Sequence, residues 1–248
     1  MKGFGLIGYP LSHSFSRKYF NEKFKKEHIT GCYYENFPLR DIEGLPDLIA
    51  SKPELAGLNI TIPHKERVLS YLNHIDKDAA AIGAVNTIKI IREASSFFLE
   101  GYNTDALGFY MSVKPLLKDY HRGAIILGTG GASKAAAYVL RKINIDVIFV
   151  SRKPYLENHI SYEGLSHDII KEHLIIVNTT PLGTYPEIST LPDIPYSYLT
   201  NRHLLFDLVY NPSETLFLKK GRSMGAVVIN GLEMLHLQAE KSWEIWNS

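Results

Sequence analysis

Hydroxyl, amide, ammonium and carboxylate side chains gather in the first half of the chain, at predicted strand ends and loops. Hydroxyls and amides bind hydroxylated and carboxylated molecules, and one lysine with one aspartate can transfer a proton or stabilise a developing negative charge. The set therefore suits a small, hydroxylated and possibly carboxylated substrate, although each member alone is explained as well by a cap, a turn or a solvated helix position. Its members are Ser14, Ser16, Asn59, Thr61, Lys65, Asn86, Asn103, Thr104 and Asp105.

Metal chemistry and covalent chemistry are not indicated. The ten histidines form no H-E-x-x-H motif, Cys32 is the only cysteine, and no nucleophile motif occurs. We therefore expect neither a metal site nor an internal disulfide.

A glycine-rich turn indicates a dinucleotide site. The apolar run 124–127 leads into Gly-Thr-Gly-Gly at 128–131, and small residues then recur at helical spacing. Gly128 permits a tight exit from the strand, and Gly130 lets a pyrophosphate approach the amides at the helix start. Ser133 replaces the third glycine of G-x-G-x-x-G, so an ordinary strand-to-helix turn remains the alternative. The residues expected at the cofactor are Gly128, Gly130, Gly131, Ala132 and Ser133.

The end of the next strand favours NADP over NAD. NAD-binding folds usually carry Asp or Glu there, because the carboxylate accepts a hydrogen bond from the ribose 2′-hydroxyl. Here the strand 146–150 is followed by Ser151, Arg152 and Lys153, which suit a 2′-phosphate. A solvated strand end would look similar, but the distance from the glycine loop makes NADP the expected cofactor. This expectation depends chiefly on Arg152.

Length and composition indicate a globular protein that acts on small molecules. With 248 residues and 45% hydrophobic content, the chain can bury the core of one large domain or two modest ones. Its 27 Lys and Arg oppose 26 Asp and Glu, so bulk charge favours neither nucleic acid nor an anionic membrane. No run approaches the roughly 20 apolar residues of a membrane span, and the first residues lack the apolar region of a signal peptide. We expect a cytoplasmic protein that is a monomer or a homodimer.

The elements that must position these side chains alternate between strand and helix, which predicts an α/β protein. The final helix can return to the first half, and the second half has the pattern of a doubly wound, Rossmann-like parallel sheet. Strands are expected at 4–7, 32–37, 55–62, 124–127, 146–150, 174–177, 204–209 and 226–229, with a hairpin of 83–91 and 97–99. Helices are expected from a cap at Ser12 or Ser14 to near Gly31, and at 41–51, 64–72, 104–118, 132–140, 161–173 and 232–246.

Taken in order, these motifs resemble those of shikimate dehydrogenases. The resemblance implies a reversible NADPH-dependent reduction of 3-dehydroshikimate to shikimate, in the pathway to chorismate and the aromatic amino acids. It also implies a substrate-binding domain of residues 1–103 and 232–248 and an NADP-binding, Rossmann-like domain of residues 104–231. The matching segments, which span nearly the whole chain, are 14–16, 59–65, 83–87, 103–105, 128–133, 178–183 and 231–238.

The resemblance also implies the roles of individual residues. Ser14 and Ser16 would bind the substrate carboxylate, and Lys65 and Asp105 would form the catalytic pair, either of which could carry the proton. The ring hydroxyls and the rest of the substrate would be held by Asn59, Thr61, Asn86, Tyr210 and Gln238. The cofactor would contact, besides the glycine loop, Ser151, Arg152, Lys153, Thr179 and Gly231.

Two other functions remain open. A quinate/shikimate dehydrogenase using NAD or both cofactors would share nearly every motif, and Tyr102, Ala106 and Thr184 depart from common family residues. Arg152 without an acidic neighbour argues against NAD. A non-catalytic NADPH-binding regulatory protein could use the same fold, but the presence of both Lys65 and Asp105 argues against it.

Overall fold

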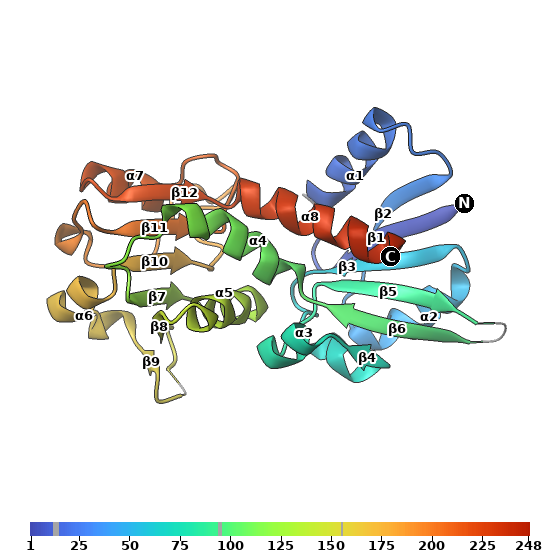
Figure 1. Ribbon diagram of the computed structural model, residues 1–248, viewed down its shortest axis with the longest axis horizontal. Helices are drawn as coiled ribbons and strands as arrows, with labels where there is room; N and C mark the ends of the chain where they lie inside the picture. The colour runs from blue at the N-terminus through green and yellow to red at the C-terminus, as the bar shows by residue number, and fades with distance from the viewer. Residues whose placement is uncertain (12–14, 94–95, 155) are drawn as a thin grey trace. The chain divides into compact units, whose positions relative to one another are not determined.

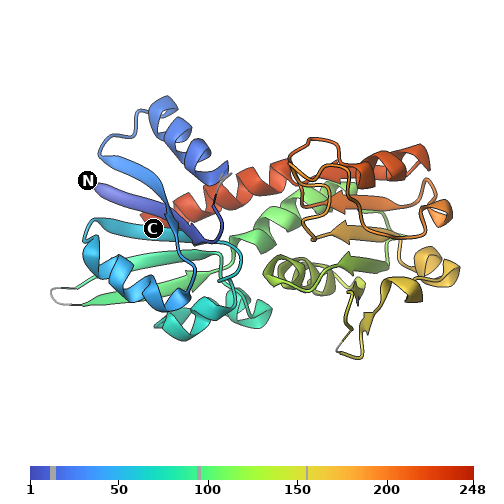
Figure 2. The ribbon, with the colours of Figure 1, turned by 180° about the vertical axis from the view of Figure 1, so that it is seen from behind.

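The computed structural model describes residues 1–11, 15–93, 96–154 and 156–248, and it confirms the predicted α/β class (Figures 1 and 2). The chain divides into two compact units, residues 1–104 with 239–248 and residues 105–238. Each unit contains one six-stranded sheet. The second division between the units, at 238/239, falls within the last helix, whereas the division that the family resemblance implies lies at the start of that helix.

The sheet of the first unit is mixed, with the order β2-β1-β3-β5-β6-β4. The central strands β1 and β3 are buried along most of their length, while the edge strand β2 is partly exposed. The predicted hairpin is confirmed as the antiparallel pair β5 and β6. The strands are β1 (Lys2–Gly8), β2 (Cys32–Pro38), β3 (Leu55–Ile60), β4 (His74–Ile75), β5 (Thr87–Arg92) and β6 (Phe97–Tyr102), and the helices are α1 (Phe15–Lys26), α2 (Leu45–Ser51) and α3 (Lys77–Ile82).

Side chains of β1 separate the core of this unit into two parts. Because neighbouring residues of a strand point to opposite faces, Leu6 and Ile7 enter different clusters. Leu6 and Phe4 join an aromatic cluster with α1 and the end of helix α8 (Leu232–Asn247), in which the rings of Phe4 and Trp246 stack with their centroids 4.8 Å apart. The indole of Trp246 donates to the backbone oxygen of Ile88 at 2.9 Å. The end of α8 is therefore part of the core of the first unit.

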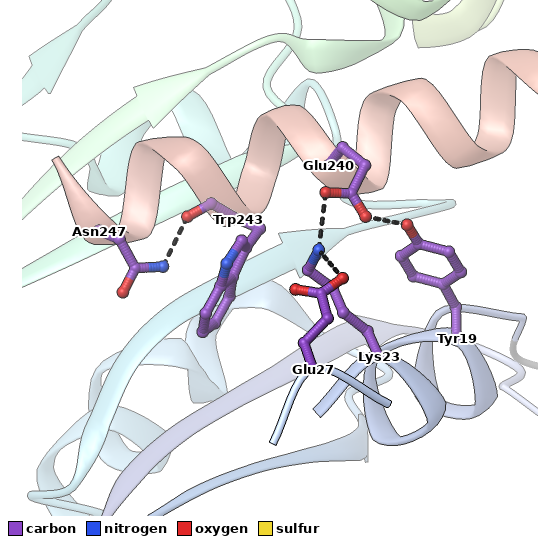
Figure 3. Close-up of polar contacts among 6 residues, drawn as sticks. All are labelled: Tyr19, Lys23, Glu27, Glu240, Trp243 and Asn247. Atoms are coloured by element: carbon purple, nitrogen blue, oxygen red, sulfur yellow. Dashed lines mark hydrogen bonds and ion pairs between the residues drawn. The ribbon is translucent and has the colours of Figure 1, made fainter. Parts of the chain in front are cut away.

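A charged cluster also joins α8 to α1 (Figure 3). The Lys23 ammonium lies 2.8 Å from a carboxylate oxygen of Glu27 and 2.8 Å from one of Glu240, and the Tyr19 hydroxyl donates to the other oxygen of Glu240. Burial alone would lower the pKa of Lys23, but the hydrogen bonds to the two glutamates outweigh this effect and raise it. The Lys23 side chain is only 8% exposed, so its charge depends on these partners.

Replacing Lys23 with Met should lower the free energy of unfolding by about 2 kcal/mol, because Glu27 and Glu240 would face each other without the cation between them. Lys18→Met is the matched control, since Lys18 is 78% exposed and lies 3.8 Å from Glu22, and it should change stability by less than about 0.5 kcal/mol. Urea unfolding followed by tryptophan fluorescence measures both, since the only two tryptophans of the chain lie on this part of α8. Equal effects of the two substitutions would contradict the prediction.

The sheet of the second unit is entirely parallel, with the order β12-β11-β10-β7-β8-β9. From β7 the chain passes to β8 on one side and later to β10 on the other, which makes the carboxyl end of β7 the switch point of a doubly wound sheet. The strands are β7 (Gly123–Leu127), β8 (Asp146–Val150), β9 (His159–Ile160), β10 (Ile175–Asn178), β11 (Leu204–Asp207) and β12 (Val227–Asn230). The helices of this unit, besides the start of α8, are α4 (Thr104–Val113), α5 (Gly131–Lys142), α6 (His167–Glu172) and α7 (Leu216–Ser223).

The predicted helix at 64–72 is wrong. Only the short 3-10 helix η2 (Arg67–Tyr71) forms there, because the carbonyl of Lys65 accepts a hydrogen bond from the Val85 amide at 2.8 Å instead of closing a helical turn. The His64 ring is buried and lies 2.6 Å from the carbonyl oxygen of Leu39. Contacts from other segments thus set the backbone here.

Two further differences concern helix ends in the second unit. The helix expected at 161–173 is confined to α6, because the Ser166 hydroxyl accepts from the Ile169 amide and caps a helix that starts only at His167. Helix α7 was not predicted, although Thr215 caps it by accepting from the Leu218 amide.

Candidate active site

Asn59 lies near the carboxyl end of β3 and is only 4% exposed. The Tyr34 hydroxyl donates to its Oδ1 at 2.8 Å, and its Nδ2 donates to Ser242 Oγ at 3.0 Å and to Thr87 Oγ1 at 3.2 Å. Protein groups on both sides therefore set the orientation of this amide. Thr61, two residues later, is half-buried, and its backbone amide donates to Ile7 at 2.9 Å.

Backbone hydrogen bonds place Lys65 beside the segment that carries Asn86. The Val85 amide donates to the Lys65 carbonyl at 2.8 Å, and the Ile60 amide donates to the Asn86 carbonyl at 2.8 Å. The Lys65 side chain is half-buried. The structure thus brings together four of the predicted site residues, Asn59, Thr61, Lys65 and Asn86.

The side chain of Asn86 holds the first residue of α4. Its Oδ1 accepts from the Thr104 amide at 2.7 Å, and its Nδ2 donates to Thr104 Oγ1 at 3.0 Å, which satisfies a helix-start amide that has no partner within the helix. Asp105 follows directly and is 7% exposed. A carboxylate in the first turn is favoured by the helix dipole. Asn103 immediately precedes α4, and its Nδ2 donates to the Ala84 carbonyl at 2.8 Å, which fixes the position of this residue.

The other predicted substrate residues lie on separate elements. Ser14 lies outside the described residues, whereas Ser16 is buried in the first turn of α1. Burial raises the pKa of the Tyr34 hydroxyl far above its usual value, against the opposing effect of a hydrogen bond from the Ser16 side chain. Tyr210 is half-buried after β11, and burial raises its pKa. Gln238 is 7% exposed on α8, where its Nε2 donates to the Leu235 carbonyl at 3.0 Å.

The predicted glycine loop connects β7 to α5. Gly128 has φ of 109°, and a Cβ at this residue would lie 2.7 Å from Thr179 Oγ1, so a side chain is excluded on both grounds. Thr179 donates to the Leu127 carbonyl at 2.6 Å, so the Ser133 hydroxyl, 2.6 Å from Thr179 Oγ1, must donate to it. Two predicted cofactor residues thus contact each other. Ser133 uses its hydroxyl to hold α5 against the loop after β10, which a third glycine could not do.

Several features around this loop fit a dinucleotide with a 2′-phosphate. A Cβ built on Gly130 would meet no atom within 4 Å, so the space beside the loop is open. Gly131 and Ala132 begin α5, and the amides at the start of a helix can donate to an anion. Ser151 Oγ is buried and has no hydrogen-bond partner among the described residues, and Arg152, which follows it, is exposed. The ribose phosphate of NADP would supply acceptors for such groups.

Gly231, also predicted at the cofactor, has a structural requirement of its own. A Cβ at this position would lie 2.2 Å from the carbonyl oxygen of Leu208, so only glycine allows the start of α8 to pass this backbone. Lys153, the remaining predicted residue, is exposed next to Arg152.

Asp207 is a buried carboxylate that the sequence analysis did not single out. It accepts hydrogen bonds from Asn178 Nδ2 at 2.9 Å, from the Val209 amide at 3.0 Å and from the Thr215 hydroxyl at 2.5 Å. Burial is the main reason that the pKa of Asp207 is raised to about 6. Because Asn178 also binds Thr180, this carboxylate connects the loop after β10 to the segment before Tyr210. The signal for it was an acidic residue at the end of an apolar strand.

Replacing Asp207 with Asn should remove a pH dependence of stability. Between about pH 4 and pH 6 the unfolded chain is ionised at Asp207 while the folded chain keeps the proton, so wild-type stability falls as the pH rises. Over this window the wild type should lose about 3 kcal/mol relative to the variant. Calorimetry at a series of pH values measures the free energy of unfolding of both proteins. The difference between them isolates Asp207, because His121 and His203, whose pKa values burial lowers, contribute equally to both. A constant difference would contradict the prediction.

Across the described ranges, the helices are too short or too polar to cross a membrane. In the same ranges, no three His, Cys, Asp or Glu side chains are grouped so that they could hold a metal ion.

Comparisons with known proteins point to one family. Residues 6–88 match the family described as the shikimate dehydrogenase substrate binding domain. The chain is 39% identical over 262 residues to the shikimate dehydrogenase (NADP(+)) of Methanococcus maripaludis, which covers 98% of this chain and 90% of that relative. The structure is similar to that of shikimate dehydrogenase 1 from Peptoclostridium difficile, with a TM-score of 0.85, 40% identity and coverage of 100% of this chain and 92% of the other. It is also similar to a shikimate dehydrogenase solved in complex with NADP+, with a TM-score of 0.84, 34% identity and coverage of 99% and 90%.

Proposed function

The chain belongs to the shikimate dehydrogenase family, and we propose on that premise that it catalyses the reversible NADPH-dependent reduction of 3-dehydroshikimate to shikimate. This reaction is a step of the pathway to chorismate and the aromatic amino acids. The observation that carries the proposal is the arrangement of Lys65 and Asn86, whose segments are hydrogen-bonded to each other, with Asn86 holding the residue before Asp105.

We assign substrate binding to residues 1–103 and 232–248 and NADP binding to residues 104–231. The family match over residues 6–88 supports the first assignment. The open space beside Gly130, the buried Ser151 hydroxyl and the exposed Arg152 support the second.

In the direction of reduction, bound NADPH supplies a hydride to the ketone carbon of the substrate. The ketone oxygen becomes negatively charged as the hydride arrives, and the Lys65 ammonium stabilises this charge. Lys65 or Asp105 then delivers a proton to the oxygen, which completes the alcohol, and the Asp105 carboxylate orients the lysine and the substrate hydroxyls. In the reverse direction the same pair removes the hydroxyl proton.

The remaining site residues bind and orient the substrate in this proposal. Ser14 and Ser16 bind its carboxylate through their hydroxyls, together with the amides of the first turn of α1. The ring hydroxyls and the rest of the substrate are assigned to Asn59, Thr61, Asn86, Tyr210 and Gln238.

The proposal is tested by following NADPH absorbance with shikimate or quinate and with NADP or NAD. We expect fast turnover with shikimate and NADP, and slower turnover when either partner is exchanged. Preference for quinate or for NAD would identify the related quinate/shikimate dehydrogenase. Binding of NADPH without any turnover would favour the regulatory alternative.

We also propose that the enzyme acts in the cytoplasm, which is supported by the single cysteine and the balanced charge, and that it is a monomer or a homodimer. Cell fractionation and light scattering of the purified protein test these two statements.

A further inference from the structure

We propose that Ser242 and Tyr34 are positioning residues of the substrate site, which act through a directed chain of buried hydrogen bonds from Ser16 to Thr104. The inference rests on the proposed function and extends it to two residues that the sequence analysis did not single out. All residues of this hydrogen-bond chain lie in the first unit.

The hydroxyl of Ser242 lies where three other elements meet. Ser242 is fully buried on α8, and its Oγ is 3.0 Å from Asn59 Nδ2 on β3, 2.8 Å from Thr87 Oγ1 on β5 and 3.3 Å from Thr104 Oγ1 at the start of α4. A serine at this position therefore cross-links two strands and two helices. Asn59 is separated from Ser242 by 183 positions in the sequence.

The direction of each bond in the first part of the chain follows from the donors available. An amide nitrogen can only donate, so Asn59 Nδ2 donates to Ser242, and Oδ1 of Asn59 accepts from Tyr34. The Tyr34 oxygen is then the acceptor for the Ser16 side chain. These bonds favour one of the two orientations of the Asn59 amide. In the flipped orientation its Nδ2 donor would face the Tyr34 hydroxyl, which donates here, and its Oδ1 acceptor would face the Ser242 oxygen, which accepts here.

The second part of the hydrogen-bond chain connects Ser242 to the start of α4. Thr87 donates to Asn86 Oδ1 at 3.1 Å, so in its 2.8 Å contact with the Ser242 hydroxyl the Thr87 oxygen is the acceptor. Asn86 Nδ2 in turn donates to Thr104 Oγ1 at 3.0 Å. These hydrogen bonds connect Ser16 to Thr104, the residue before Asp105.

Burial makes this chain sensitive to the loss of one hydroxyl. Asn59, Asn86, Thr87 and Thr104 are each at most 4% exposed, so water cannot easily replace a lost partner. Without the Ser242 hydroxyl, the Asn59 amide and the Thr87 hydroxyl lose a partner that fixed their direction. The side chain of Asn86 and the start of α4 would then be less well ordered before the substrate binds, which weakens substrate binding rather than the chemical step.

Ser242→Ala should raise KM for shikimate about five- to tenfold, with kcat within about threefold of wild type and KM for NADP unchanged. Tyr34→Phe, which removes the other contact that orients Asn59, should have an effect in the same range. The double variant should show less than the product of the two effects, since both act through one amide. A loss of folded protein alone would lower apparent kcat and leave KM unchanged, so the split between KM and kcat separates positioning from destabilisation.

Ser112→Ala is the matched control. Ser112 is also a buried serine in a helix, but its hydroxyl donates to the Gly108 carbonyl within α4 at 2.9 Å. The Ser112→Ala variant should therefore have the same KM for shikimate as the wild type. Wild-type KM for shikimate in both Ser242→Ala and Tyr34→Phe, even with lowered melting temperatures, would overturn the inference. Failure of the wild-type enzyme to oxidise shikimate with NADP would instead overturn the proposed function.

Discussion

Replacing Lys65 with Ala should lower kcat for shikimate by roughly 10²- to 10⁴-fold while KM changes little. The ammonium interacts only weakly with a neutral ketone but strongly with the alkoxide that forms when the hydride arrives. Its loss therefore raises the transition state more than the bound substrate. Steady-state kinetics with shikimate and NADP measure both parameters.

Lys25→Ala provides a control for the loss of a positive charge from the same unit, because Lys25 is exposed on α1. Its kinetics should match those of the wild type. Asp105→Asn should also lower kcat, and the double variant with Lys65→Ala should be less than additive because the two side chains act as a unit. A nearly normal kcat with a large rise in KM would reduce Lys65 to a binding residue and leave Asp105 as the catalytic candidate.

Replacing Arg152 with Asp should weaken NADPH binding by on the order of 2 kcal/mol, which is about 30-fold in Kd, and should affect NADH far less. The guanidinium attracts the 2′-phosphate, and the new carboxylate would repel it. NADH has a hydroxyl at this position and loses neither interaction. Fluorescence titration of both cofactors gives the two dissociation constants.

The matched control is Arg122→Asp, which makes the same change of charge at an exposed residue. Arg122 precedes β7, whereas the glycine loop follows it, so the charge changes at the opposite end of the strand. Neither cofactor should bind differently to this variant. Equal losses of NADPH and NADH in Arg152→Asp would show that Arg152 does not discriminate between them.

Features that depend on neighbouring residues could be predicted from the amino-acid sequence alone. The glycine turn was predictable because strand, turn and helix follow within the segment 123–142, and the positive φ of Gly128 is a local requirement. The parallel second sheet followed from apolar runs spaced by helical segments, and the hairpin of β5 and β6 from two adjacent strands. Arg152 could be predicted as a cofactor residue in the same way, because the prediction used only its separation in sequence from the glycine loop.

The contacts between polar side chains and distant parts of the protein could not be predicted, because they depend on how the elements pack. The segment after Lys65 has helical spacing, but the Val85 amide takes the Lys65 carbonyl and no α-helix forms. Ser133 stands where a glycine was expected, and its use became clear only from its contact with Thr179, 46 positions later in the sequence. No local sequence pattern predicts a role for Ser242, because its hydroxyl contacts residues of β3, β5 and α4 that are distant in sequence. A buried hydrogen bond is decided by which atoms share the interior, and positions distant in sequence become neighbours there only when the sheet and its covering helices have packed.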